Sequence, residues 1–356
     1  MILLAGVLLA VHLVTIAIVL WRMSRPVRRE TDMPQVTLIR PVCGLDYGIE
    51  QTLASGFAQD APGYRLIHCV QRDDDPALPL LRRLMAAHPG VDAHLTGPEQ
   101  VITGNPKLNN LASGWPLVAG EWVVMADSNL LLPPDYLRVV MARRGRGMVS
   151  SPACGTNPAT FWARVEAGFL NTYQARWQLA GDSLGNGFAQ GKTLAYPLDW
   201  LNAQGGLPAL GHDLAEDVAS TKLTRADGGR VRLTPRPFAQ PLGPRSRAQV
   251  LGRQIRWARL RRAGFPMIFA SEALTTPALP LLLLAGAWPA AIPAFLALWY
   301  GAEWLLARRA GWPAGAVDLA AWVTRDALLW PIWAAGWRQG GALTWRGNAV
   351  TDAKDA

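Results

Sequence analysis

The stretch Glu121-Trp-Val-Val-Met-Ala-Asp127 is the clearest indication of the fold class, because it is a short apolar run that ends in a single carboxylate. Its valines and tryptophan are typical of a buried strand. Three similar runs precede it, at Val36–Val42, Arg65–Val70 and Val91–Leu95. Runs of helical character lie between them, at Tyr47–Phe57, Leu78–Ala87 and Pro106–Ala119. This alternation predicts an α/β fold with a mostly parallel sheet flanked by helices.

The chain that follows this region is less regular. Its helical runs are Ala159–Gln178, Pro197–Ala203, His212–Ala226 and Arg245–Arg262. A glycine-rich segment covers residues 181–191, and Arg230–Thr234 has the character of an edge strand. In parallel sheets, ligands bind at the carboxyl ends of the strands, so polar side chains that follow strands are the candidate site residues.

Apolar segments near both ends predict an integral membrane protein. Ile2–Trp21 carries no formal charge and is long enough to cross a bilayer, and the absence of a cleavage signal favours an anchor over a signal peptide. Leu274–Leu298 is either one tilted helix or, continued to Ala307, a hairpin. Val317–Trp337 contains three charged residues and is either a span or an interfacial helix.

We therefore expect five parts in chain order. They are an N-terminal transmembrane anchor (1–22), a linker (23–34), an α/β catalytic domain (35–265), C-terminal membrane helices (266–340) and a tail (341–356). Arginines follow the first apolar segment, which predicts a catalytic domain on the cytoplasmic side of a membrane, with a bacterial inner membrane as the expected location.

The charge and cysteine content narrow the class of partner. The net charge is +9, but the basic residues lie beside apolar segments instead of forming tracts with interleaved aromatics. This placement favours contact with anionic membrane lipids and argues against nucleic acid. The three cysteines include no Cys-x-x-Cys pair, which predicts reduced thiols. The five histidines lack the spacing of a zinc site.

Single carboxylates after the predicted strands are the first candidates for chemistry. Asp127 begins Asp127-Ser128-Asn129 and is suited to bind a divalent cation, Mg²⁺ or Mn²⁺, or else to cap a helix. Asp73, Asp74 and Asp75 follow the second strand, and this cluster either binds the base or ribose of a nucleotide or caps the next helix.

Three further motifs lie on predicted helices. Asn105-Pro-Lys-Leu-Asn-Asn110 opens a helix, where Lys107 is placed to reach a nucleotide and Asn109 to order the turn, or both serve ordinary capping. Glu216 and Asp217 begin a later helix, and one of this pair is the candidate general base. In Arg253-Gln-Ile-Arg256-Trp257, Arg253 and Arg256 share a helix face suited to a diphosphate, with Trp257 as an apolar wall.

In this order, the motifs resemble those of the ceramide glucosyltransferases, including their bacterial members, which are membrane-bound glycosyltransferases with the GT-A fold. The resemblance extends from residue 35 to residue 270. The stretches that carry it are Ile39–Gly44, Cys69–Gln71, Asp75-Pro76, Asn105–Asn110, Ala126–Asn129, Ala215–Asp217 and Arg253–Trp257.

The resemblance implies inverting transfer of glucose from UDP-glucose to the primary hydroxyl of ceramide, giving glucosylceramide. It implies that the Asp73–Asp75 cluster contacts the nucleotide and that Asp127 holds the metal and diphosphate. It also implies that Asp217 is the base, and that Arg253, Arg256 and Trp257 close the site around the diphosphate. We expect Asp127, Asp217 and Arg256 to converge on one activated sugar.

Three positions depart from the family pattern. Arg72 follows the Val-Gln pair where the animal enzymes have an aspartate, so it is open which of the next three aspartates takes that role. Asn129 stands where many related transferases have the second aspartate of Asp-x-Asp, which leaves metal identity and dependence open. Gln174 stands where the animal enzymes have a histidine linked to inhibitor sensitivity.

Other functions remain open on the sequence alone. The sugar is alternatively galactose or N-acetylglucosamine, and the acceptor is alternatively a hopanoid or another lipid. A processive polysaccharide synthase shares the arginine-tryptophan motif, but few apolar segments follow that motif here. A non-catalytic membrane scaffold with a degenerate nucleotide-binding domain is the alternative from another class. The sequence does not determine the oligomeric state.

Overall fold

The structure is a computed structural model that describes residues 1–338, 343–345 and 348–350. The chain forms two compact units that alternate along the sequence. Unit 1 comprises Met1–Pro26, Cys154–Leu184 and Leu242–Gly340, and unit 2 comprises Val27–Ala153, Gly185–Pro241 and Gly341–Ala356. The five-part division expected from the sequence follows chain order, whereas unit 1 groups the first and last helices with an internal segment. That functional division therefore stays a prediction.

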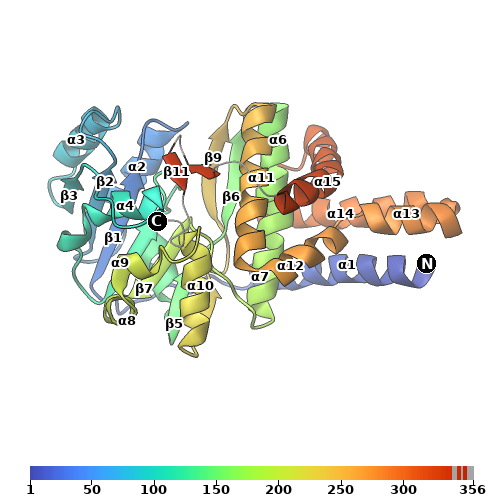
Figure 1. Ribbon diagram of the computed structural model, residues 1–356, viewed down its shortest axis with the longest axis horizontal. Coiled ribbons are helices and arrows are strands. Elements are labelled where there is room, and N and C mark those ends of the chain that lie inside the picture. Colours follow the sequence, from blue (N-terminus) through green and yellow to red (C-terminus); the bar gives the residue numbers. More distant parts are fainter. Residues whose placement is uncertain (339–342, 346–347, 351–356) are drawn as a thin grey trace. The chain divides into compact units, whose positions relative to one another are not determined.

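Unit 2 contains a seven-stranded sheet in the order β3-β2-β1-β4-β7-β5-β8 (Figure 1). The strands are β1 Val36–Val42, β2 Arg65–Val70, β3 Asp92–Thr96, β4 Trp122–Ala126, β5 Gly147–Ser150, β7 Thr193–Pro197 and β8 Arg230–Leu233. Neighbouring strands run parallel except for β7, which is antiparallel to both β4 and β5. The predicted α/β class and the predicted edge strand are confirmed, while β5 and β7 were not expected.

Helices cover the sheet of unit 2. They are α2 Ile49–Phe57, α3 Leu78–Ala87, α4 Pro106–Ala112, α5 Tyr136–Met141, α8 Leu198–Ala203, α9 Gly206–Ala209 and α10 Glu216–Ala226. The helix expected to continue to Ala119 ends at Ala112 and is followed by the 3₁₀ turn Trp115–Leu117. Pro116 explains the early end, because its ring nitrogen has no hydrogen to donate to the carbonyl of Ala112.

Alternation along the strands assigns the helices to the two faces of the sheet. Side chains such as Leu38, Leu66 and Val124 share one apolar core with residues of α2, α3 and α5. The intervening side chains face the other way. On that face Tyr196 of β7 shares a hydrogen bond of 2.6 Å with Ser220 of α10. A Cβ on Gly114, just beyond α4, would lie 2.8 Å from Ile67 on the same face. The α4 and α10 helices therefore cover this second face.

Unit 1 is helical. Its elements are α1 Ile2–Ser24, α6 Phe161–Gly168, the π-helix η2 Phe169–Ala175, α7 Arg176–Ser183, α11 Arg247–Gly264, α12 Pro266–Ser271, η3 Glu272–Thr275, α13 Ala278–Ala287, η4 Pro289–Ala291, α14 Ile292–Ala310 and α15 Ala316–Trp337. The helix expected at Ala159–Gln178 is present as the uninterrupted series α6, η2 and α7. The chain passes between the units through β6 Ala153–Pro158 and β9 Phe238–Gly243, and β10 Leu343–Trp345 pairs with β11 Asn348–Val350.

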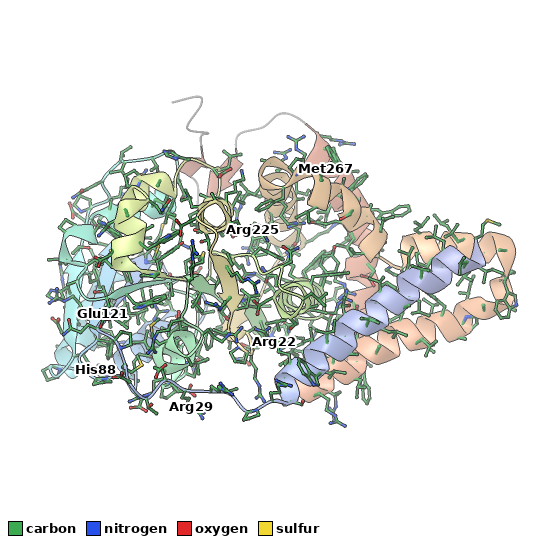
Figure 2. All side chains as sticks on the ribbon, turned by 90° about the horizontal axis from the view of Figure 1, so that it is seen from below. Arg22, Arg29, His88, Glu121, Arg225 and Met267 are labelled. Atoms are coloured by element: carbon green, nitrogen blue, oxygen red, sulfur yellow. The ribbon has the colours of Figure 1, made fainter. Side chains whose placement is uncertain are left out.

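Two helices of unit 1 have the length and apolar composition of membrane spans, namely Ile2–Ser24 and Pro289–Ala310. The pair Pro266–Thr275 and Ala278–Ala287, bent by 47°, is a third candidate. The α1 helix packs along α13 and α14 (Figure 2). Its His12 ring stacks on the Trp299 ring of α14, with 3.6 Å between the ring centroids. At the end of α1, Arg22 forms an ion pair of 2.7 Å with Asp182 of α7. These contacts join the first helix to the C-terminal helices and to α7.

Arg40 of β1 is fully buried and ties the segment after β4 to the sheet. Its guanidinium donates to the carbonyl oxygens of Thr52 at 2.6 Å, Asp127 at 3.0 Å and Leu130 at 2.8 Å. Burial is the larger effect and lowers its pKa to about 10, so Arg40 stays charged at neutral pH. The segment from Asp127 to Leu130 is thus held by a buried cation.

We expect Arg40→Met to lower the free energy of unfolding by about 3 kcal/mol, because buried carbonyls that lose their donor cost about 1–3 kcal/mol. Thermal unfolding of the purified protein in detergent measures the loss. The control is Arg83→Met, which removes an exposed ion pair with Glu50 and should cost at most about 1 kcal/mol. Equal melting temperatures for the two variants would contradict the role assigned to Arg40.

Candidate active site

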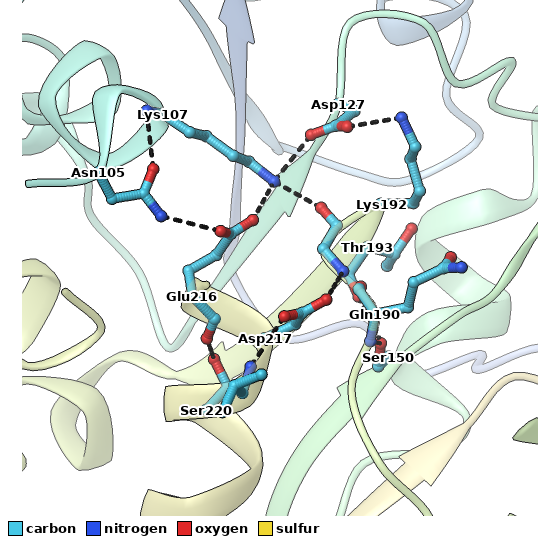
Figure 3. A network of polar contacts seen from close by, with 12 residues as sticks. Asn105, Lys107, Asp127, Ser150, Gln190, Lys192, Thr193, Glu216, Asp217 and Ser220 are labelled. Carbon is cyan, nitrogen blue, oxygen red and sulfur yellow. Dashed lines mark hydrogen bonds and ion pairs between the residues drawn. The ribbon is translucent and has the colours of Figure 1, made fainter. Parts of the chain in front are cut away.

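The candidate active site lies in unit 2, on the face of the sheet that α4 and α10 cover. Asp127 directly follows β4, and the strand alternation turns its side chain to the same face as Met125. Lys107 comes from the first turn of α4, and Glu216 and Asp217 come from the first turn of α10. Figure 3 shows these four side chains in one polar network.

Lys107 is the centre of this network. Its ammonium group donates to Asp127 Oδ1 at 2.8 Å, to Glu216 Oε1 at 2.8 Å and to the carbonyl of Gly191 at 2.5 Å. Asn105 supports the arrangement from both sides, because its Oδ1 caps α4 by accepting from the Lys107 amide and its Nδ2 donates to Glu216 Oε2 at 3.0 Å. The Asn-Pro-Lys motif therefore starts a helix and aims its lysine between two carboxylates.

The dipeptide Gly191-Lys192, just before β7, completes the network. The Gly191 carbonyl accepts from Lys107, and its amide donates to Asp217 Oδ2 at 3.0 Å. The ammonium group of Lys192 donates to Asp127 Oδ2 at 2.8 Å. A Cβ on Gly191 would lie 2.6 Å from Glu216 Oε1, so this close packing suits glycine. These two consecutive residues thus bond to Lys107, Asp217 and Asp127.

The charges shift the pKa values of Lys107 and Asp127 in opposite directions. Burial alone lowers the pKa of Lys107, but Asp127 and Glu216 together raise it well above its usual value. Burial alone raises the pKa of Asp127, but the two lysines hold it well below its usual value. Both groups are therefore charged throughout the neutral pH range.

Asp217 differs from Asp127 because, among the described residues, its carboxylate accepts from backbone amides and not from an ammonium group. The pKa of Asp217 is raised to about 7, mainly by burial and secondly by the negative charge of Glu216. Donation from the amides of Gly191 and Val218, and the more distant charge of Lys107, act against this rise. A carboxylate with this pKa exchanges its proton near neutral pH, which is the property of a general base.

The other predicted acidic and amide residues of unit 2 lie outside this network. Asp75 is buried, and its carboxylate accepts from the amides of Gly44 at 2.9 Å and Ala77 at 2.8 Å. Asp74 forms an exposed ion pair with Arg72, which holds its pKa below its usual value. Asp73 is exposed, and Asn109 accepts from the amides of residues 102 and 103. The contacts of Asp75 and Asn109 are those of ordinary turn-capping groups.

Arg253, Arg256 and Trp257 belong to unit 1, on α11. Arg253 donates to the buried carboxylate of Glu166 on α6, and Trp257 packs against an apolar cluster that includes Ala163 and Leu170. The pKa of Arg256 is lowered, mainly by burial and to a smaller extent by the positive charge of Arg253. The network belongs to unit 2 and this motif to unit 1, and their convergence on one sugar stays a prediction.

The donor groups at Asp127 do not match a divalent-cation site as they stand. Among the residues that the structure describes, no group of three or more His, Cys, Asp or Glu side chains is placed to hold a metal ion. Each carboxylate oxygen of Asp127 faces an ammonium group, and the side-chain oxygen of Asn129 accepts from Lys192 at 2.9 Å. A hard cation needs several oxygen ligands, so it would have to displace at least one lysine here.

Sequence reasoning identified Lys107, Asp127, Glu216 and Asp217 but missed Lys192. The available signal was its rarity, since the chain has four lysines among 35 basic residues. Two of these four contact the same carboxylate. Lys192 follows a glycine-rich segment in a chain whose basic residues are mostly arginine, and this unusual choice of residue indicates a specific role.

Comparison with known proteins places the chain in a family. The family model described as glycosyl transferase family 21 matches residues 4–354, so the chain belongs to that family. The chain is 26% identical over 274 residues to a protein of Caenorhabditis elegans named ceramide glucosyltransferase 1, covering 76% of this chain and 59% of that protein. It is also 37% identical over 102 residues to a ceramide glucosyltransferase of Komagataella phaffii, covering 27% of this chain and 19% of that protein. The resemblance to ceramide glucosyltransferases is therefore confirmed.

Among solved structures, the chain is similar to the mannosyltransferase PcManGT from Pyrobaculum calidifontis, solved in complex with GDP-Man and Mn²⁺. The TM-score is 0.53 with 21% sequence identity, and the match covers 94% of this chain and 97% of that one. At this identity the likeness concerns the fold alone, and it confirms the expected GT-A-like architecture.

We expect Lys107→Met to lower the free energy of unfolding by about 3 kcal/mol, because Asp127 and Glu216 would keep buried charges without their shared cation. Chemical unfolding in detergent measures this effect. Lys222→Met is the matched control, since Lys222 forms a partly exposed pair with Asp213 and its loss should cost at most about 1 kcal/mol. If the two variants lost the same stability, Lys107 would not be the centre of the network.

Proposed function

We propose that the protein transfers glucose from UDP-glucose to the primary hydroxyl of ceramide with inversion, giving glucosylceramide. Membership of glycosyl transferase family 21 supports a glycosyltransferase, and the names of the curated relatives support ceramide as acceptor. The chain spans about 59% of the length of the first of these relatives, so their activity comes to this chain as a proposal. The observation that carries it is the network that joins Asp127, Lys107, Glu216 and Asp217.

In the proposed reaction, the ceramide oxygen attacks the anomeric carbon while Asp217 takes the hydroxyl proton. The bond from that carbon to the diphosphate oxygen breaks, and UDP leaves with the bonding electrons. The raised pKa of Asp217 supports this role, because a base with a pKa of about 7 is about half ionised at pH 7 and is basic enough to accept a proton. A single displacement of this kind inverts the configuration of the sugar.

Fixed positive charge beside the leaving diphosphate lowers the barrier, because it needs no reorganisation as charge develops. Lys107 is the candidate in unit 2, and the resemblance supports Arg253, Arg256 and Trp257 as diphosphate-binding residues of α11. The Asp73–Asp75 cluster is proposed to contact the nucleotide, with Asn109 ordering the neighbouring turn. The family resemblance implies a divalent cation, Mg²⁺ or Mn²⁺, at Asp127, but both oxygens of Asp127 are paired with lysines, so the reaction is written without a metal.

The candidate spans support an integral membrane protein, and the arginines after α1 support a catalytic domain on the cytoplasmic side of a bacterial inner membrane. Anionic membrane lipids are the proposed partners of the basic residues beside these helices. Transfer of galactose or N-acetylglucosamine, to ceramide or to a hopanoid, is the second candidate, and the general base serves that reaction equally.

The test is to incubate the purified full-length protein with ceramide and a panel of UDP-sugars, and to identify the lipid product by mass spectrometry. We expect glucosylceramide from UDP-glucose, and at least about a 100-fold loss of rate in Asp217→Asn, since general bases contribute 10²–10⁴-fold. A different glycolipid would select the second candidate. Nucleotide binding without transfer or hydrolysis would favour the non-catalytic scaffold.

The pH dependence of the rate tests the base separately. Since Asp217 must be ionised to accept a proton, kcat/KM should fall as the pH drops below about 7. Glu216→Gln removes the neighbouring negative charge, so the pKa of Asp217 should fall and the acidic limb should move to lower pH by about one unit. A limb that stays in place in this variant would remove Asp217 from the base role.

A further inference from the structure

Lys192 is fixed opposite Asp127 by the backbone of the sheet. In the antiparallel pairing of β4 with β7, Ala126 lies opposite Thr193. The ladder continues for one more bond, in which the amide of Asp127 donates to the carbonyl of Lys192 at 3.2 Å. The position of this lysine beside Asp127 therefore follows from strand register and not only from side-chain attraction.

The ammonium group of Lys192 bridges two oxygens that lie two residues apart after β4. It is 2.8 Å from Asp127 Oδ2 and 2.9 Å from Asn129 Oδ1. The side-chain nitrogen Nδ2 of Asn129 donates to Asp46 Oδ2 at 3.2 Å, and the side-chain oxygen Oδ1 of Asn129 therefore faces the lysine. An Asp-x-Asn segment would offer these two oxygens to a metal cation. Here they bind the ammonium group of Lys192, a cation that belongs to the chain itself.

The chemistry of lysine suits this position. A compact ammonium group fits between two oxygens as a point charge, whereas the planar fork of arginine does not. The chain has four lysines among 35 basic residues, and two of them place their charges on Asp127. Together they bring two positive charges to one carboxylate, which is the charge that a single divalent cation would supply.

We propose that Lys192 is a tethered replacement for the divalent cation, so that the protein binds the diphosphate of its sugar nucleotide at Asp127 without requiring a metal. This inference rests on the proposed function for the identity of the ligand, a nucleoside diphosphate. The side chain of Lys192 keeps 14% of its surface exposed, and that of Asp127 keeps 23%. Both groups are thus partly exposed at the carboxyl end of β4. Lys192 binds the leaving diphosphate together with Lys107 and makes the Asp127 oxygens poor ligands for Mg²⁺ or Mn²⁺.

The decisive variant is Lys192→Met, which keeps the length of the side chain and removes its charge. Mn²⁺ binding is measured by electron paramagnetic resonance of the free ion, with neither nucleotide nor lipid present. We expect the wild-type protein to bind Mn²⁺ at least tenfold more weakly than Lys192→Met, in which Asp127 and Asn129 become available as ligands. Lys222→Met should match the wild type, because Lys222 contacts Asp213 and not Asp127. Equal Mn²⁺ affinity in the wild type and Lys192→Met would overturn the proposal.

UDP binding supplies the second arm. In excess EDTA, the wild type should bind UDP in a calorimetric titration, and Lys192→Met should lose at least tenfold in affinity. Added Mn²⁺ should restore binding in the variant and change little in the wild type. Loss of wild-type UDP binding in EDTA would overturn the proposal. The Mn²⁺ measurement requires no transfer reaction. Failure to glucosylate ceramide would therefore refute the proposed function and leave the role proposed for Lys192 untouched.

Discussion

The arrangement of the site depends on one buried ammonium group shared by two carboxylates. Lys107 reaches both Asp127 and Glu216, which come from segments separated by 89 residues in sequence. Without a common cation, two negative charges so close together on one face of the sheet would repel each other and would be costly to bury. The lysine therefore sets the spacing between the end of β4 and the start of α10. The contacts of Asn105 with Glu216 and of Gly191 with Asp217 form around that spacing.

The same arrangement separates the properties of the two aspartates. Asp127 contacts two ammonium groups and is held in its charged form, whereas Asp217 lies beside Glu216 and accepts from the backbone amides of Gly191 and Val218. Two chemically identical side chains thus acquire different pKa values from their neighbours alone. The difference matches the division of labour proposed for them, in which one carboxylate stays charged to organise cations and the other exchanges a proton. The carbonyl and amide of Gly191 link the two environments, because they bond to Lys107 and Asp217 respectively.

Much of this site was accessible from the sequence because its residues follow strong local signals. Asp127 follows a strand of five buried residues, and Glu216 begins a helix at the predicted acidic pair. Lys192 escaped detection because its role depends on the pairing of β7 with β4. The strand Thr193–Pro197 is short and follows a glycine-rich segment, so it lacks the length over which periodicity can be recognised. Its antiparallel direction, within a sheet expected to be mostly parallel, is a tertiary property with no local signal.

The ion pair between Arg253 and Glu166 is a second contact that the sequence could not predict. The arginine motif was recognisable as a cationic patch, but its buried partner lies 87 residues earlier in the chain. The spacing of Arg253 and Arg256 on one helix face says where their charges lie relative to each other, and nothing about which carboxylate one of them already contacts. Periodicity within an element is thus predictable, while the pairing of charges between elements requires the fold.

Exposure distinguishes the candidate site from a purely structural ion cluster elsewhere in the chain. In unit 1, Arg325 pairs with Glu303 at 3.0 Å and with Asp326 at 2.8 Å, and the side chains of Arg325 and Glu303 are each only 1% exposed. Those charges pair with one another in the interior of unit 1, where almost none of their surface is exposed. At Asp127 the side chain is 23% exposed, although its two oxygens are paired just as completely. The pair of Asp127 and Lys192, at 23% and 14% exposed, contributes less to stability than the more deeply buried contacts of Lys107, since water screens exposed ion pairs. The openness is therefore better explained by a ligand that exchanges contacts with these groups than by the needs of folding.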